Sequence, residues 1–412
     1  MSHRTPMNML VRRDRGQVSD SFHKSPNKSS TNHRINLPQI TENYKKLWKI
    51  VFYLLTLHPK LQNMAEYKKR ISDRILKRKV QGKGAVLIEG PKWCGKTTTA
   101  KQLANSVLDL GNSTVLMQSR QMIEISHKVL LDGDTPRLID EWQALPPIWD
   151  SIRSEVDSRG EPSQFILTGS SVLPEANTLI HSGTGRFGHI RMRPMSLFES
   201  GESNGKVSLL DLFENRPFEL QRNELTINDI AFLTCRGGWP WATLISKDLA
   251  LDQAFDYVDS VVNSDILRVD KVRRSPERTK LLLRSYARNI SQQISYATIR
   301  KDMLANDAST LDEDTVADYI KALKKLFVVE DLAAWNPNIR SKSAIRTSDT
   351  RHFVDPSIGT AALGLGPKDL MNDLQTLGLF FEDLVGRDLR VYADALDGEL
   401  YHYRDSSGLE CD

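Results

Sequence analysis

Cysteine is scarce in this chain of 412 residues. Only Cys94, Cys235 and Cys411 are present, and their spacing matches neither a disulfide framework nor a zinc site. Long apolar runs are also missing, because the best one, residues 50–57, is about half of the roughly 18 residues that a membrane helix needs. The N-terminus lacks the pattern of a secretory signal peptide. We therefore expect a soluble, cytoplasmic protein without structural zinc and without a membrane partner.

Acidic residues are rare in the first 84 positions, which hold 19 Lys and Arg against five Asp and Glu, whereas the remainder carries 37 against 47. A basic segment on an acidic body suits contact with nucleic acid or with a membrane surface. The same composition, rich in Ser, Asn, Arg and Lys and without periodicity, is also typical of a solvated tail. We favour a disordered tail for residues 1–47 and predict that a basic amphipathic helix begins near Met64.

An alternation of strand and helix patterns begins at residue 85. Short apolar runs predict strands, and the amphipathic stretches between them predict helices. The expected strands are 85–89, 113–118, 136–140 and 164–168, and the expected helices start at 97 and 147. This order predicts an α/β fold with a parallel sheet.

The remainder of the chain is expected to be mainly helical. Residues 206–265 predict helices broken by the sequence RGGWPWA, and 276–335 predict three helices before an apolar run. A hairpin-like region is expected at 339–354. The tail from 374 predicts one long helix and then two strands around a Ser-Ser-Gly turn.

The stretch from 86 to 100, VLIEGPKWCGKTTTA, contains the spacing G-x-x-x-x-G-K-[ST] between an expected strand and an expected helix. Such a loop turns consecutive backbone N–H groups toward one anion, and the following helix adds its positive end. Lys96 can reach the β- and γ-phosphates of a nucleotide, and the Thr97 hydroxyl can bind Mg²⁺. The predicted nucleotide contacts are Gly90, Pro91, Lys92, Trp93, Cys94, Gly95, Lys96, Thr97 and Thr98. For Cys94 itself, we favour a small residue that fits the loop over a redox-active thiol.

A second motif, the acidic sequence LIDEWQ, follows the loop by about forty residues. Asp140 ends a short apolar strand, and the carboxyl ends of parallel strands lie on the ligand side of such a sheet. Asp140 is therefore expected to hold Mg²⁺. Glu141 is expected to orient and deprotonate an attacking water, as the catalytic base.

Two further segments offer polar groups to the same site. Thr168 and Ser170 follow the next strand, where a hydroxyl could sense the γ-phosphate or the lytic water, although turn chemistry also favours these residue types. Arg186, between glycines in HSGTGRFGHI, is a candidate for stabilising charge on the γ-phosphate. The pattern leaves open whether Arg186 acts within its own chain or in a neighbouring subunit, which would imply self-association through this core.

The loop together with LIDEWQ, FILTGS, SGTGRF and RMRPMSLFESGES resembles a family of prokaryotic AAA-type ATPases of poorly defined function, over residues 66–412. The resemblance implies an α/β P-loop NTPase core, a winged-helix-like region and a restriction-endonuclease-like C-terminal fold. It also implies ATP as ligand, Lys96, Thr97 and Asp140 as contacts to the nucleotide and Mg²⁺, and Glu141 as base. The expected domains are a basic extension (1–63), the ATPase core (64–205), a helical connector (206–275), the winged-helix-like region (276–355) and a truncated C-terminal domain (356–412).

The winged-helix-like region is a poor match to a DNA reader. Its expected recognition helix, 312–326, begins with Asp312, Glu313 and Asp314, and a recognition helix meets DNA mainly through its N-terminal residues. The expected wing carries cations that suit phosphate contacts: Arg340, Lys342, Arg346 and Arg351. We prefer a packing or partner-docking module, and DNA remains only a weak candidate partner.

The tail matches the endonuclease-like pattern incompletely. By the resemblance, Glu382 and Asp412 occupy the first two acidic positions, and no Glu-x-Lys strand follows. We therefore expect no metal-dependent nuclease activity from this chain.

These observations predict an ATP-binding protein that hydrolyses ATP with Mg²⁺ to switch a conformation. The alternative is a binding module that uses ATP as a structural clip without turnover, with DNA as one candidate partner. A small-molecule kinase is disfavoured, because the tandem Asp-Glu motif is typical of hydrolysis and the sequence indicates no acceptor pocket.

Overall fold

A five-stranded parallel sheet in the order β2-β3-β4-β1-β5 forms the first part of the computed structural model. Its strands are β1 (Ala85–Glu89), β2 (Ser106–Asp109), β3 (Arg137–Asp140), β4 (Phe165–Gly169) and β5 (Phe187–Arg191). Strands β3 and β4 are buried along their whole length and β1 nearly so, as expected for a parallel sheet that is covered on both faces. The predicted α/β fold with a parallel sheet is confirmed.

The structure describes residues 67–170, 183–218, 222–270, 272–305, 311–335, 348–404 and the backbone of 410–411. All of these belong to one compact unit. The expected basic extension, the apolar run at 50–57, most of the hairpin-like region and the Ser-Ser-Gly turn lie outside the described residues.

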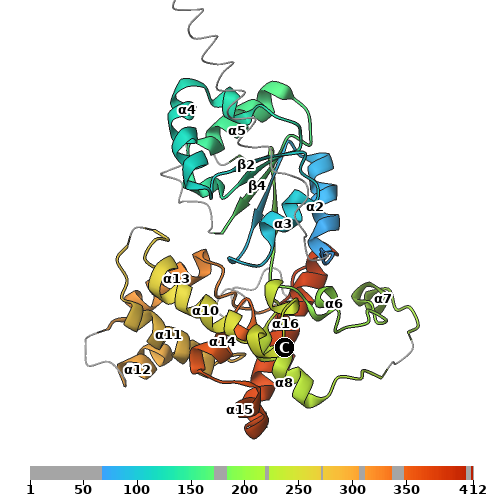
Figure 1. Cartoon of the computed structure of the whole chain (residues 1–412). Helices are drawn as coiled ribbons and strands as arrows, with labels where there is room; N and C mark the ends of the chain where they lie inside the picture. Colours follow the sequence, from blue (N-terminus) through green and yellow to red (C-terminus); the bar gives the residue numbers. More distant parts are fainter. Residues whose placement is uncertain are drawn as a thin grey trace, which may run out of the picture. The chain divides into compact units, whose positions relative to one another are not determined.

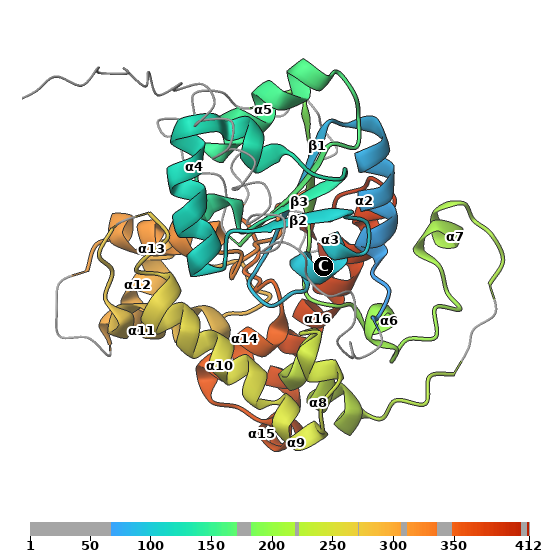
Figure 2. The same cartoon turned by 45° about the horizontal axis from the view of Figure 1, so that its top comes forward.

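Helices cover the two faces of this sheet (Figures 1 and 2). Helices α2 (Ile71–Gly82) and α3 (Lys96–Lys101) lie on one face, and α4 (Ser113–Leu131) and α5 (Ile148–Arg159) lie on the other. The amphipathic helix expected from Met64 begins only at Ile71, and Tyr67–Arg70 precede it without helical structure. The helices expected near 97 and 147 are confirmed.

The strand expected at 113–118 is wrong, because these residues form the first turns of α4 and the strand is β2. The Asn112 side chain accepts hydrogen bonds from the backbone N–H groups of Thr114 and Val115, at 2.9 and 3.3 Å. Such an N-cap satisfies amide groups that a helix leaves unpaired at its start. The cap therefore favours a helix over the strand that the β-branched residues suggested.

The rest of the described chain is mainly helical. It consists of α6 (Leu197–Ser200), α7 (Leu209–Phe213), α8 (Ile227–Arg236), the 3₁₀ turn Trp241–Thr243, α9 (Lys247–Ala250), α10 (Asp252–Ser260), the π-helical turn Val261–Asp265, α11 (Pro276–Arg288), α12 (Tyr296–Leu304), α13 (Glu313–Lys325), α14 (Pro356–Leu363), α15 (Pro367–Asn372), α16 (Leu374–Asp394), β6 (Tyr403–Arg404) and β7 (Glu410–Cys411). The three helices expected within 276–335, the long helix from 374 and the two terminal strands, which pair antiparallel, are confirmed.

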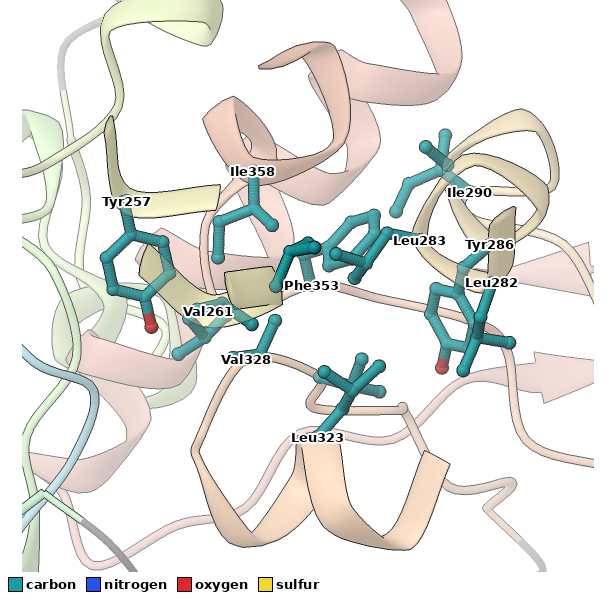
Figure 3. Packing of buried hydrophobic residues seen from close by; sticks show 14 of the residues in the cluster. Tyr257, Val261, Leu282, Leu283, Tyr286, Ile290, Leu323, Val328, Phe353 and Ile358 are labelled. Atoms are coloured by element: carbon teal, nitrogen blue, oxygen red, sulfur yellow. The ribbon is translucent and has the colours of Figure 1, made fainter. Parts of the chain in front are cut away.

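One hydrophobic core unites most of these helices, from α8 to α16 (Figure 3). It contains side chains from α10, α11, α13 and α14, and from the segments that follow α11 and α13. Tyr257, Leu282, Tyr286, Phe353 and Ile358 are all at most 2% exposed. Residues from three of the expected domains share this core, and the boundaries at 276 and 356 stay predictions.

A buried ion cluster ties α16 to the rest of the fold. The Arg387 guanidinium bonds Asp355 at 2.9 Å and Asp388 at 2.7 Å, and Arg387 is 1% exposed. The same two carboxylates also accept backbone N–H groups of Gly238 (2.9 Å) and Leu197 (3.0 Å). One guanidinium thus fixes α16, the start of α14, the loop after α8 and the start of α6.

We expect Arg387→Ala to lower the free energy of unfolding by about 3–5 kcal/mol, because it leaves two buried carboxylates without their cation. Urea unfolding followed by circular dichroism measures this loss. The matched control is Arg284→Ala, which removes an exposed arginine from α11. Equal, small losses in both variants would show that the cluster does not stabilise the fold.

Candidate nucleotide site

The loop from Gly90 to Lys96 connects β1 to α3 at the carboxyl end of the sheet. Gly95 has a φ of 99°, a conformation that L-residues rarely adopt. Gly90 lies so close to the neighbouring segment that a Cβ atom there would be 2.0 Å from the carbonyl oxygen of Met192. Both glycines are therefore required by the shape of the loop, as the motif predicted.

Lys96 folds back over this loop. Its Nζ donates to the carbonyl oxygens of Gly90 at 2.9 Å and Pro91 at 2.6 Å, and the residue is 5% exposed. An ammonium group has three donors, and these two hydrogen bonds use two of them. The positive charge of Lys96 is therefore held at the loop, where it can interact with an anion.

The two predicted metal-binding residues are adjacent. The Thr97 hydroxyl donates to Oδ1 of Asp140 at 2.7 Å, and the same oxygen accepts the hydroxyl of Thr168 from β4. Within the described residues, no group of three or more His, Cys, Asp and Glu could hold a metal by itself. One carboxylate and one hydroxyl fit Mg²⁺, which commonly takes one or two carboxylates and completes its shell with water and substrate phosphates.

Glu141 follows β3 in a left-handed conformation, with a φ of 53°. Its Oε2 accepts hydrogen bonds from Oγ of Ser170, at 3.2 Å, and from Nε2 of Gln143. Its backbone N–H donates to Oγ1 of Thr168 at 3.3 Å. The predicted base and the predicted hydroxyl of Ser170 are therefore in contact.

A cavity of about 790 Å³ lies against this loop. Its size is within the range of small-molecule sites, roughly 300–1,000 Å³. Seven of the predicted residues line it: Lys92, Trp93, Gly95, Lys96, Thr97, Thr98 and Glu141. Five other predicted residues do not line the cavity: Gly90, Pro91 and Cys94 in the loop, Asp140 at the end of β3, and Ser170 just after β4.

The variable positions of the loop contact the helical region. Nζ of Lys92 lies 2.5 Å from Oδ1 of Asp265, which ends the π-helical turn. The Trp93 ring meets Tyr257 of α10 edge-on with centroids 5.8 Å apart, and Tyr257 packs on Trp239 at 4.4 Å. The loop is therefore joined to the helices by one ion pair and a chain of aromatic rings.

Cys94 takes a different position from its neighbours in the loop. It is fully buried, and Sγ lies 3.6 Å from the carbonyl oxygen of Met192. This placement supports the packing role that we favoured.

Arg70 is a member of the site that we did not predict. Its guanidinium donates to the carbonyl oxygens of Cys94 and Arg193, both at 2.8 Å, and pairs with Glu199 at 3.0 Å. Just before it, the Tyr67 hydroxyl lies 2.9 Å from Oγ1 of Thr99. The basic composition of this segment was visible in the sequence, but nothing local marked these two residues as contacts of the loop.

The segment from Met195 to Gln253 also contributes residues that we did not predict. Met195, Trp239, Pro240, Trp241, Thr243, Leu244 and Gln253 line the cavity. The sequence RGGWPWA was identified only as a break between helices. Its two tryptophans, Trp239 and Trp241, were the available signal, because aromatic side chains commonly line ligand pockets.

Arg186 does not lie at the phosphate loop of its own chain. Its carbonyl accepts the backbone N–H of Ala85, which places it at the amino end of β1, opposite the loop. The exposed side chain pairs with Asp157 at 2.8 Å, which raises the pKa of the Arg186 guanidinium. Action within the chain is therefore ruled out by this geometry, and action in a neighbouring subunit stays a prediction.

Of the expected wing residues, the structure describes only Arg351, and its position differs from the prediction. Arg351 is buried and bonds Asp331 at 2.8 Å and the carbonyl oxygen of Ile294, so it is not available for phosphate contacts. Arg340, Lys342, Arg346 and Asp412 lie outside the described residues. Glu382 is on α16, whose buried acidic residues are Asp383 and Asp388.

The comparisons with known proteins agree with the loop. Residues 82–200 match a family model described as an AAA domain, and residues 227–369 match one described as a domain of unknown function (DUF8612). A search of curated proteins finds no match. The first match, together with the loop geometry, identifies an AAA-type P-loop domain within this chain.

Two solved structures show distant likeness. A Walker-type ATPase of Pyrococcus abyssi is 15% identical with a TM-score of 0.47, over 74% of this chain and 99% of that chain. A chain in the structure of Drosophila ORC bound to DNA is 11% identical with a TM-score of 0.19, over 84% and 96%.

Among the helices that the structure describes, none combines the length and the apolar character that crossing a membrane demands.

Proposed function

We propose that this protein binds ATP with Mg²⁺ in the cavity beside Lys96 and hydrolyses the γ-phosphate. The observation that carries the proposal is the assembly at one sheet edge of Lys96, the Thr97–Asp140 pair and Glu141. A cation, a pair of metal-binding oxygens and a carboxylate base are the groups that phosphoryl transfer to water requires. Each of these residues therefore has a role in the proposed reaction.

The phosphates lie on the loop, where Lys96 donates to the β- and γ-phosphate oxygens. Thr97 and Asp140 would hold Mg²⁺, which would supply positive charge to stabilise the phosphates. Glu141 lines the same cavity and accepts a proton from the attacking water, while Ser170 holds its other side. Each step uses a group that is already oriented by the fold.

The purine or pyrimidine ring of the nucleotide lies against aromatic side chains that line the cavity. Trp93 and Trp241 are 49% and 60% exposed although both line it, and Leu244 lines it too. Flat aromatic faces suit stacking with a purine ring. Residues of the helical region thus complete the site that the AAA-type domain begins.

ATP hydrolysis is coupled to movement of the helical region through the loop. Lys92 and Trp93 are part of the phosphate loop and also contact Asp265 and Tyr257. A ligand that repositions the loop changes both contacts, and such differential contacts are what couple binding to conformation. Arg186 from a neighbouring subunit would complete the catalytic site, which makes self-association part of this proposal.

The second candidate function is a clip that binds ATP without turnover. The clip is favoured by the position of Arg186. In an isolated chain, the loop that carries Arg186 cannot provide a second cation to the γ-phosphate of bound ATP. Partner docking remains preferred over DNA binding, because Asp312, Glu313 and Asp314 are exposed at the start of α13.

The test is ATP binding and turnover by the purified full chain. We expect calorimetry to detect Mg²⁺-dependent binding of ATP. We also expect a phosphate-release assay to detect turnover, and the rate per chain should rise with protein concentration if subunits associate. Binding without any turnover would support the clip, and no binding would contradict both functions.

A further inference from the structure

Gln143 sits directly behind the proposed base. The left-handed turn at Glu141 reverses the chain into the 3₁₀ turn Trp142–Ala144, which brings the Gln143 side chain back to Glu141. Nε2 of Gln143 donates to Oε2 of Glu141 and lies 3.3 Å from Oγ of Ser170. Gln143 does not line the cavity, so it reaches a ligand only through these two residues.

The opposite end of the amide is held in an unfavourable environment. Oε1 of Gln143 is buried and accepts no hydrogen bond within the described part of the chain. A buried, unsatisfied acceptor costs about 1–3 kcal/mol. The orientation that leaves Oε1 without a partner is the one that directs Nε2 at Glu141.

The backbone around Gln143 is shaped to keep the amide there. A Cβ atom at Gly169, at the end of β4, would be 3.2 Å from Oε1 of Gln143 and 2.9 Å from Nε1 of Trp142. Glu141 itself has a φ of 53°, which is strained for a residue with a side chain. The strained backbone at Glu141 and the close packing at Gly169 therefore both limit where the Gln143 amide can lie relative to the Glu141 carboxylate.

We propose that Gln143 is the positioning residue for Glu141, and the proposal rests on the hydrolysis proposed above. Gln143 and Ser170 donate to the same carboxylate oxygen, Oε2. With Oε2 of Glu141 fixed by these two donors, the other carboxylate oxygen, Oε1 of Glu141, is the atom left to accept the proton of the attacking water. Without the amide, the carboxylate rotates about its side-chain bonds and meets the water in the correct geometry less often.

The experiment compares Gln143→Ala with the parent in steady-state hydrolysis and in calorimetry. We expect kcat to fall about 10-fold or more, as for the loss of a hydrogen bond to a charged group, and the Kd for ATP to stay within about 2-fold. Ser170→Ala removes the second donor, and the double variant should approach the activity of Glu141→Gln. The matched control is Gln164→Ala, which removes a buried glutamine that lies just before β4 and does not line the cavity.

Dependence on Glu141 separates positioning from a general structural role. In the Glu141→Gln background, single-turnover rates should not change further on adding Gln143→Ala, because the base is already lost. A further loss in that background, a weaker Kd for ATP, or an unchanged or increased kcat in Gln143→Ala would each overturn the proposal. A parent protein that binds ATP but never hydrolyses it would instead overturn the proposed function and this inference with it.

Discussion

Lys96→Ala is expected to abolish measurable ATP binding. Its ammonium group lies at the loop, bonded to the carbonyl oxygens of Gly90 and Pro91, and is available to phosphate oxygens. Charge-assisted hydrogen bonds contribute about 1.5–3 kcal/mol each, so losing two weakens binding by at least about 100-fold. Isothermal titration calorimetry with Mg²⁺ and ATP measures the change.

The matched control for this variant is Lys101→Ala. Lys101 ends the same helix, α3, but its side chain is exposed and does not line the cavity. Its Kd for ATP should equal that of the parent. Full ATP affinity in Lys96→Ala, with the control behaving as expected, would contradict the assignment of the phosphate loop.

Glu141→Gln is expected to separate binding from chemistry. The amide keeps the shape of the side chain but cannot accept a proton from water, so turnover should fall by about 100-fold or more while ATP still binds. Phosphate release and calorimetry on the same preparation measure the two quantities.

Glu124→Gln controls for the change of charge. Glu124 is exposed on α4, so its replacement should alter neither turnover nor affinity. Hydrolysis at the parental rate by Glu141→Gln would exclude Glu141 as the base and would leave the clip as the better function.

The phosphate site was predictable because its residues are close in sequence or follow strands. The spacing of Gly90, Gly95 and Lys96 carries the loop by itself, and the rule that strand ends meet at one edge places Asp140 and Glu141. The structure brings all of these together. Ser170, at the end of the next strand, followed from the same rule.

The parts of the site that we missed depend on contacts between distant segments. Arg70 reaches Cys94, Arg193 and Glu199 across the sequence, and no local pattern encodes such a contact. The location of Arg186 was not predictable either, because its glycine-rich surroundings indicate a loop but do not say at which end of the sheet that loop lies. Gln143 is only two residues from Glu141, yet its orientation depends on the left-handed backbone that one sequence does not reveal.

Arg70 also determines where a working fragment of this protein has to begin. The family match starts at residue 82, which is the last residue of α2 and lies well after Arg70. Glu199, inside the matched range, accepts the Arg70 guanidinium and the backbone N–H of Ile71, at 3.0 and 2.7 Å, and its side chain is 1% exposed. A fragment cut at the matched limits would retain this buried carboxylate without either donor. The unit that folds is therefore wider than the unit that sequence similarity outlines, and fragments for biochemistry should start no later than Tyr67.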